Sequence, residues 1–180
     1  MIRIAHADDA AILAAIYQPY VERTWISFEE TAPSASDMLA KYLTGREHYP
    51  WLIAEHDGEV AGYAYGSVHR GRPAYRWSVE TTIYLREDAH GLGLGKRLYG
   101  ALIETLRKQG FRSAFAGIAL PNPASVALHA SLGFEPIGIF PAVGFKLGAW
   151  RDVAWSRLNL TNEGDAPLPE PLKVSEVLSS

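Results

Sequence analysis

Residues 85 to 96 read Leu-Arg-Glu-Asp-Ala-His-Gly-Leu-Gly-Leu-Gly-Lys, a glycine-rich turn that follows a β-forming run and leads directly into an amphipathic helix. Glycine tolerates positive φ and lets bare backbone N–H groups approach an anion, and the helix that begins here adds its positive dipole end. The turn therefore indicates a phosphate site in which the main chain does most of the binding. Because Gly-x-Gly-x-Gly also occurs in ordinary turns, the neighbouring sequence has to decide which ligand is bound.

The composition limits the possible classes of protein. With 180 residues, of which 48% are hydrophobic, the chain can bury one core, and a single domain is expected over residues 1–160. The net charge of −3 gives no general attraction to nucleic acid or to a membrane surface. The absence of cysteine excludes disulfides, thiolate metal sites and a cysteine acyl-enzyme. No stretch resembles a signal peptide or a membrane span, which predicts a soluble, cytoplasmic protein.

Local signals predict the elements before the glycine turn. Residues 2–5 indicate a short strand, and a helix follows that Asp8 can cap and that Pro19 should kink or shorten. A second, shorter helix should be capped by Ser34 or Ser36 and end near Gly45. The pair Asp57-Gly58 stands between two β-forming runs and is a strong hairpin signal.

The order of elements argues against a dinucleotide-binding fold. Three consecutive strands precede the glycine turn, which predicts an α+β domain with an antiparallel or mixed sheet of about seven strands flanked by helices. The glycines also lie in the middle of the chain, whereas a dinucleotide fingerprint follows the first strand. The helix after the turn should pack one leucine face on the sheet, because leucines recur at positions 94, 98, 102 and 106. The elements expected around and after the turn are a strand over residues 75–86, this helix ending at Gly110, a strand over 111–120, a helix over 124–132, strands over 135–146 and 150–160, and a flexible tail over 161–180.

Two motifs resemble those of a known family. Residues 90–95, His-Gly-Leu-Gly-Leu-Gly, resemble the acetyl-CoA pyrophosphate loop of the GNAT superfamily of N-acetyltransferases, and residues 122–134 resemble its next motif. Within that superfamily, residues 77–85 and 144–153 look like those of the phosphinothricin and methionine sulfone/sulfoximine N-acetyltransferases. The resemblance covers residues 2–160. It implies a three-layer GNAT fold whose strands splay apart at the acetyl-CoA site.

The resemblance implies that acetyl-CoA is bound as the acetyl donor, without a metal. In the family, the strand at residues 83–85 pairs with the pantetheine arm where it parts from the following parallel strand. His90 stands where the family usually has Gln or Arg, so less side-chain charge is available to the pyrophosphate. The residues implied to bind the donor are Ile83, Tyr84, Leu85, His90, Gly91, Leu92, Gly93, Leu94, Gly95, Lys96, Asn122 and Ser125.

Acetyl transfer to an amine requires the amine to be neutral, because an ammonium group has no lone pair. The resemblance places Glu80 at the position of the general base, acting through a water. It assigns stabilisation of the carbonyl oxygen to the main chain near Ile83, and protonation of the CoA thiolate to His129. The alternatives are a cross-strand-paired glutamate, a structural histidine, and an Asn122 that only caps a helix.

The implied acceptor is a small, amino-acid-like amine of the phosphinothricin, methionine sulfoximine or methionine sulfone type, which would include a herbicide. An anionic α-amino acid analogue needs cations and polar groups near the thioester. The substrate residues expected are Phe28, Arg70, Arg72, Pro73, Ala74, Tyr75, Glu80 and Lys146. The four remaining histidines show no metal-ligand spacing and are interpreted as ordinary residues; they are His6, His48, His56 and His69.

Other functions stay open at this level. The same superfamily fold could acetylate a polyamine or a protein N-terminus, although such acceptors would favour an acidic groove. A non-catalytic acyl-CoA-binding sensor is a further alternative, against which Glu80 and His129 argue. Because relatives are commonly dimers, a homodimer is expected, with the strands after Phe134 at the interface. No nucleic-acid or membrane partner is expected.

Overall fold

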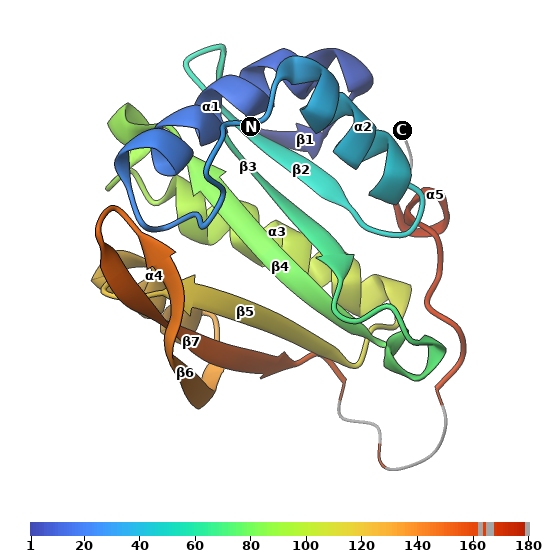
Figure 1. Ribbon diagram of the computed structural model, residues 1–180. Helices are drawn as coiled ribbons and strands as arrows, with labels where there is room; N and C mark the ends of the chain where they lie inside the picture. The colour runs from blue at the N-terminus through green and yellow to red at the C-terminus, as the bar shows by residue number, and fades with distance from the viewer. Residues whose placement is uncertain (162–163, 165–167, 179–180) are drawn as a thin grey trace.

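The computed structural model describes residues 1–161, 164 and 168–178, which form a seven-stranded sheet with helices on both faces (Figure 1). The strands lie in the order β1-β2-β3-β4-β5-β7-β6, and β4 and β5 are the one parallel pair among the described strands. This confirms the expected mixed, mostly antiparallel sheet. The strands are β1 (Ile2–Ile4), β2 (Trp51–His56), β3 (Glu59–Val68), β4 (Ser78–Leu85), β5 (Ser113–Ala119), β6 (Glu135–Lys146) and β7 (Ala149–Asn159). The α-helices are α1 (Ala10–Arg23), α2 (Ala35–Gly45), α3 (Leu94–Gln109), α4 (Pro123–Ser131) and α5 (Val174–Val177).

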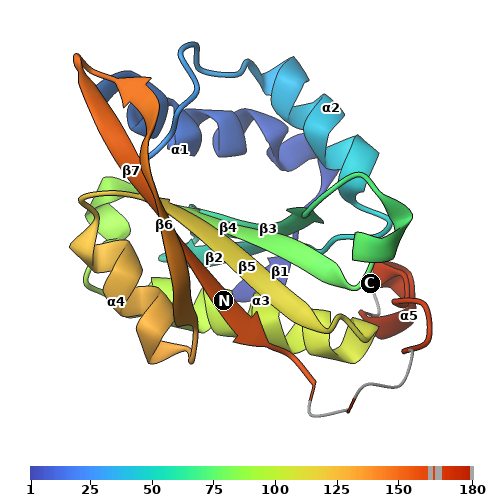
Figure 2. The same ribbon diagram turned by 60° about the horizontal axis from the view of Figure 1, so that its bottom comes forward.

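The sheet is the middle one of three layers. Figure 2 shows α1 and α2 on one side of it and α3 and α4 on the other. The leucines that recur along α3 at positions 94, 98, 102 and 106 are all buried, and three of them pack in one core with Val79 and Ala114 of the sheet. Burying each such side chain contributes about 1.5–3 kcal/mol. The predicted leucine face is therefore what fixes α3 on the sheet.

Turns and helix ends mostly follow the sequence signals. The hairpin between β2 and β3 turns at Asp57 and Gly58, both with positive φ. Gly110, with φ of 88°, ends α3, and its N–H bonds back to the carbonyls of the last turn. Ser34 caps α2 through the N–H of Asp37. These positions confirm the predicted hairpin and the predicted ends of both helices.

The structure differs from the predictions at three local positions. The first long helix is preceded by a 3-10 turn, so Asp9 rather than Asp8 stands at its N-cap. Pro19 does not shorten α1, which continues to Arg23, because packing of the helix face against the sheet outweighs one missing hydrogen bond. The strand expected from residue 75 begins only at Ser78. The residues before it, Pro73–Tyr75, form a 3-10 turn, which the fixed φ of Pro73 favours.

The segment expected to be a flexible tail makes defined contacts where the structure describes it. Residues 162, 163, 165–167, 179 and 180 of that tail lie outside the described part of the chain. Val174 of α5 is 9% exposed, and its N–H donates to the carbonyl of Glu47. The side-chain amide of Gln109, at the end of α3, donates to the carbonyl of Leu172 at 2.7 Å. The described part of this segment therefore lies against the domain (Figure 1).

The β6–β7 hairpin projects beyond the rest of the sheet, as Figure 2 shows. β6 is the edge strand, and it bulges between Phe140 and Gly144, where the side chain of Asp152 accepts the N–H of Ala142. Apolar side chains on this hairpin are 48–65% exposed: Ile137, Ile139, Phe140, Val143, Phe145, Leu147 and Trp150. We refer to these seven residues as the hairpin patch. Elsewhere, no helix of the described chain is long and apolar enough to cross a membrane.

Candidate active site

The centre of the sheet opens between β4 and β5. Their parallel ladder has three residue pairs and ends where Glu80 lies beside Phe115. Beyond this point the strands part around a cavity of about 90 Å³, whose lining includes residues 81–84 of β4 and 116–119 of β5. Main-chain groups of β4 that face this gap are free to pair with an extended ligand. The gap is the splayed-strand site that the fold was expected to contain.

The glycine turn follows directly at the end of β4. Gly91 and Gly93 have φ of 78° and 72°, a conformation that costs glycine little. Gly93 is the N-cap of α3 and offers no side-chain cap, so the N–H groups of the first helical turn remain for an anion. Lys96 is exposed and forms no ion pair with any residue that the structure describes. Backbone, helix dipole and one available ammonium group thus suit a pyrophosphate.

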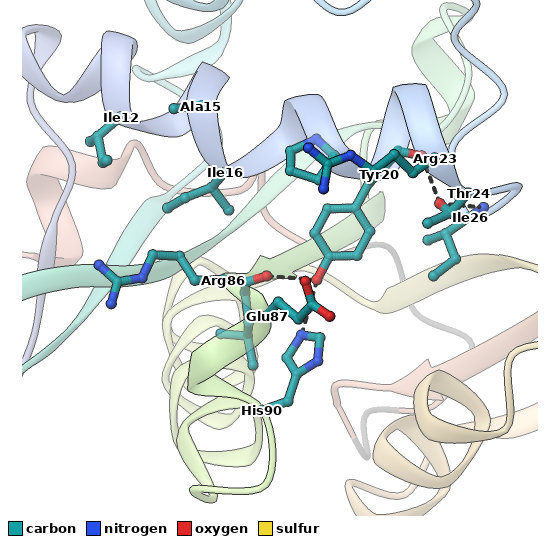
Figure 3. A pocket seen from close by; sticks show the side chains of 12 residues that line it. Ile12, Ala15, Ile16, Tyr20, Arg23, Thr24, Ile26, Arg86, Glu87 and His90 are labelled. Carbon is teal, nitrogen blue, oxygen red and sulfur yellow. Dashed lines mark hydrogen bonds between the residues drawn. The ribbon is translucent and has the colours of Figure 1, made fainter.

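A groove of about 510 Å³ runs between α1 and this turn (Figure 3). Tyr20 points from α1 towards His90 and donates its hydroxyl hydrogen to the carbonyl of Leu85 at 2.6 Å. That leaves its oxygen to accept from Nε2 of His90, 3.1 Å away. Burial also raises the pKa of Tyr20, which keeps the hydroxyl protonated. His90, the first residue of the turn, therefore forms a hydrogen bond to α1, and its ring is not available to a ligand alone.

The donor-binding candidates on β4 and in the turn differ in how deeply their side chains are buried. Tyr84 turns its ring towards α1, where it contacts Tyr17 and Tyr20 with centroid distances of 4.6 and 4.9 Å. Its contribution to the gap therefore comes from the main chain. Leu92 is half exposed, whereas Leu94 is buried in the protein. A Cβ at Gly95 would come within 3.3 Å of Leu85, so glycine allows the helix to start close to the strand.

Glu80 lies at the point where the strands part. Its Oε1 is 2.9 Å from Nδ1 of His69 and 3.3 Å from Nη1 of Arg70. The side chain is 29% exposed, so it is sheltered and still reachable. The carboxylate of Glu80 thus contacts His69 and the guanidinium of Arg70 at the mouth of the gap.

A buried chain of hydrogen bonds leads from the gap to His129. Oγ1 of Thr81 is 2.6 Å from the hydroxyl of Tyr99, which is 2.9 Å from Nε2 of His129. On the other side of the ring, Nδ1 lies 2.7 Å from the carbonyl of Ser125. A carbonyl only accepts, so Nδ1 carries the hydrogen and Nε2 accepts from Tyr99. Burial lowers the pKa of His129 and favours this neutral form.

The two remaining donor-binding candidates lie at the start of α4. Oδ1 of Asn122 accepts the N–H of Ser125 at 3.1 Å and so caps the helix. Both residues nevertheless line the gap together with His129. Asn122 therefore serves as a helix cap at the same place where a ligand contact was expected.

The substrate candidates occupy three different places. Arg70 lies beside Glu80, and Tyr75 contacts His69 with its ring edge. Phe28 packs against Gly144 of the β6–β7 hairpin. The buried ammonium of Lys146 donates to the carbonyl of Glu29, which ties β6 to the loop that carries Phe28. The other three, Arg72, Pro73 and Ala74, are exposed around the 3-10 turn before β4.

Three residues of this region are not predictable from the sequence patterns described above. His69 was interpreted as ordinary, yet it contacts Glu80. Thr81 and Tyr99 carried no motif signal, yet they connect the gap to His129. Each of these contacts joins residues at least eleven positions apart, so strand register and helix packing create them. No cluster of three or more potential metal-ligating residues occurs among the described residues.

Comparison with known proteins agrees with this geometry. Residues 2–155 match the family described as acetyltransferase (GNAT) domain. Phosphinothricin N-acetyltransferase from Streptomyces viridochromogenes is 39% identical over 94% of this chain and 90% of its own length. The L-methionine sulfoximine/L-methionine sulfone acetyltransferase of Pseudomonas aeruginosa is 40% identical over 92% of this chain and 98% of its own.

A solved structure gives the same result in three dimensions. The phosphinothricin acetyltransferase of Sinorhizobium meliloti, in complex with AcCoA, has a TM-score of 0.90 and 38% identity, and covers 96% of this chain and 94% of that one. The chain therefore belongs to the acetyltransferase (GNAT) domain family.

Proposed function

We propose that this protein transfers the acetyl group of acetyl-CoA directly to the amine of a small, amino-acid-like acceptor of the phosphinothricin, methionine sulfoximine or methionine sulfone type. The observation that carries the proposal is the position of Glu80 at the mouth of the gap between β4 and β5, next to Arg70. The names of the two relatives described above contain such acceptors: phosphinothricin in one, and L-methionine sulfoximine and L-methionine sulfone in the other. Acceptance of phosphinothricin would give resistance to that herbicide.

Acetyl-CoA, when bound, supplies the reactive thioester. We assign its pantetheine arm to the main chain of Ile83, Tyr84 and Leu85, because β4 has no ladder partner on that side. Its pyrophosphate is assigned to the turn at residues 90–95 and to Lys96. The bound AcCoA in the similar solved structure supports this assignment. A donor of this kind also favours the cytoplasm as the working compartment.

Glu80 is the proposed general base. An acceptor amine is an ammonium group near neutral pH, and the carboxylate of Glu80 takes one of its protons directly or through a water. The freed electron pair then attacks the thioester carbonyl, whose oxygen gains negative charge next to the main-chain N–H groups near Ile83. Without cysteine, the chain has no thiol that could carry the acetyl group, which agrees with direct transfer.

His129 has a narrower proposed role than the resemblance implied. Its one N–H is committed to the carbonyl of Ser125, so it has no hydrogen to give to a thiolate directly. We propose that it acts through Tyr99 and Thr81, of which Thr81 lines the gap. The hydrogens of this chain point from Thr81 through Tyr99 towards His129, so the chain orients the hydroxyl of Thr81 and gives up no proton. A water in the gap protonates the leaving thiolate, and the proton that the attacking nitrogen loses as the C–S bond breaks replaces the one that the water gave.

Arg70 is the proposed partner for the anionic group of the acceptor. Its side chain is 51% exposed and its guanidinium lies within 3.3 Å of Glu80, so it is both near the amine site and open to solvent. Guanidinium groups bind carboxylate and phosphinate oxygens well. A polyamine would meet a cation here, which disfavours that alternative.

The substitution Glu80→Gln tests the assignment of the base. We expect turnover near neutral pH to fall by about 10²- to 10⁴-fold, the usual contribution of a general base. Binding of acetyl-CoA, measured by calorimetry, should remain. Thiol release over a panel of amines is the readout, with phosphinothricin, methionine sulfoximine, methionine sulfone, spermidine and a peptide N-terminus as acceptors.

The exposed Glu104 of α3 provides the matched control, because Glu104→Gln removes a carboxylate far from the gap. This variant should keep full activity. Full activity of Glu80→Gln would remove Glu80 from the base role. If the original chain binds acetyl-CoA but releases no thiol with any amine of the panel, the sensor alternative is favoured.

We further propose that two copies of the chain associate through the hairpin patch. Exposed apolar patches of this kind mark interaction surfaces, and an edge strand such as β6 offers unpaired main-chain groups. A symmetric dimer would bury both patches against each other.

Replacing Ile139 and Phe145 by glutamate tests the dimer. Sedimentation velocity should show a dimer for the original chain and a monomer for the double variant, because buried like charges prevent association. Leu43, another exposed apolar residue, lies on α2 away from the patch, and Leu43→Glu is the control. A monomeric original chain would contradict the proposal.

A further inference from the structure

His69 stands directly beyond the last residue of β3, and its ring lies between Glu80 and Phe115. Nδ1 of His69 is 2.9 Å from Oε1 of Glu80. The ring stacks on Phe115 with a centroid distance of 4.4 Å and an angle of 11° between the planes. Its side chain is 13% exposed. The imidazole therefore has one well-defined orientation, with a nitrogen facing the proposed base.

The direction of this hydrogen bond follows from the chemistry of its partners. An ionised carboxylate only accepts, so Nδ1 of His69 carries the hydrogen and donates it to Oε1. Arg70 approaches the same oxygen at 3.3 Å and also donates to the carbonyl of His69 at 2.9 Å. Within the described chain, both hydrogen bonds to the Glu80 carboxylate fall on Oε1. Oε2 is thereby left for a water or an amine.

Packing alone does not require a histidine at this position. Besides the stack on Phe115, the rings of Tyr75 and Trp155 meet the imidazole edge-on, with centroid distances of 5.9 and 6.3 Å. A phenyl ring could make all three contacts. The nitrogen that donates to Glu80 is what histidine adds to them.

We propose that His69 is a positioning residue for acetyl transfer, which holds Oε1 of Glu80 so that Oε2 faces the acceptor amine or the water that relays its proton. The inference rests on the proposed function of Glu80 as the base. In the step it supports, an N–H bond of the ammonium breaks, the amine keeps the electron pair, and Oε2 of Glu80 gains the proton. The Nδ1–H bond of His69 stays intact throughout.

Two substitutions separate positioning from packing. His69→Phe keeps the aromatic contacts and loses the donor, whereas His69→Asn places an amide N–H near the position of Nδ1 and loses the ring. We expect His69→Phe to lower kcat by about 10- to 100-fold, the effect of losing one hydrogen bond to a charged group. The KM for the acceptor and the binding of acetyl-CoA should stay close to those of the original chain.

The order of the two variants is the deciding result. If His69 positions Glu80, His69→Asn keeps more kcat than His69→Phe although it packs worse. If the ring only fills space, the order reverses, and the proposal is overturned. Near-ultraviolet circular dichroism and urea unfolding of both variants establish that they are folded.

A double-variant cycle tests whether the effect passes through Glu80. In a Glu80→Gln background, His69→Phe should cost little further turnover, because both changes act on one proton transfer. An equal loss in both backgrounds would overturn the inference. Full turnover of Glu80→Gln alone would overturn the proposed function and this inference with it, whereas an inactive Glu80→Gln beside a fully active His69→Phe would overturn the inference alone.

Discussion

His129 is a buried histidine whose charge state is set by its surroundings. In an unfolded chain the group titrates near about 6.5. Burial lowers its pKa in the folded protein, and this outweighs the bond to the carbonyl of Ser125, which raises it. Between the folded and the unfolded value, the unfolded chain binds more protons. The contribution of neutral His129 to stability is therefore complete above about pH 6.5 and is lost as the pH falls towards the folded value.

His129→Gln should flatten this dependence. The free energy of unfolding of the original chain, from urea titrations at pH 5, 6 and 7, is expected to rise with pH, and that of the variant to rise less. Asp9, whose pKa is lowered by its hydrogen bond to Arg3, titrates below this range and affects both proteins equally. Equal slopes for the two proteins would show that His129 is not neutral and buried in solution.

At the residue scale, the sequence predicted that Glu80 lies in the strand that leads to the turn, because that strand carries a recognisable motif. It could not predict the contact of Glu80 with His69. That contact depends on the register of β3 against β4, in which Ser67 lies opposite Glu80 and brings the following loop to the carboxylate. A shift of register by one residue would separate the two side chains.

The glycine turn can be tested as an element with a matched pair of substitutions. Gly93 in the turn and Gly58 in the β2–β3 hairpin both have positive φ, and a Cβ at either would meet nothing within 4 Å. Alanine at either position should destabilise the fold by about 1–2 kcal/mol through backbone strain. Only Gly93→Ala should also raise the KM for acetyl-CoA, by about tenfold for each 1.4 kcal/mol of lost anion binding.

Steady-state kinetics and urea unfolding of both variants give the two readouts. Equal KM values for Gly93→Ala and Gly58→Ala would contradict the assignment of the turn to the donor. A stability loss confined to one variant would mean that the two backbones differ in solution.

The predictions of helices and turns are correct where neighbouring residues decide the structure, and fail where packing against distant residues decides it. The α3 leucine repeat and the Asp57-Gly58 turn each depend on a few neighbouring residues, and both were predicted correctly. Ser34 is one of the two serines predicted to cap α2. The continuation of α1 beyond Pro19 depends on packing against the sheet, which no local pattern contains.

At the scale of the whole molecule, the described C-terminal segment is expected to contribute to stability. Val174 of α5 is buried where this short helix packs against α3, whereas its neighbour Ser175 on α5 is exposed. Val174→Asp should lower the free energy of unfolding by about 2 kcal/mol or more, through lost apolar burial and an unpaired charge. Ser175→Asp should change it by less than about 0.5 kcal/mol.

Urea unfolding followed by tryptophan fluorescence measures both variants. If they unfold alike, the segment does not pack against the domain in solution, and the flexible tail expected from its composition is the better description. Composition could not settle this, because proline and acidic residues disfavour regular structure without preventing a few buried contacts.

The three-pair junction between β4 and β5 also has a mechanical consequence. It joins the four strands β1 to β4 to the three strands β5, β7 and β6. A ladder of only three residue pairs resists bending less than a longer ladder would. One contact crosses the sheet at this junction, the stack of the His69 ring on that of Phe115. If His69 positions Glu80 as proposed, the same side chain also stiffens this junction, and a substitution at position 69 is expected to change rigidity and turnover together.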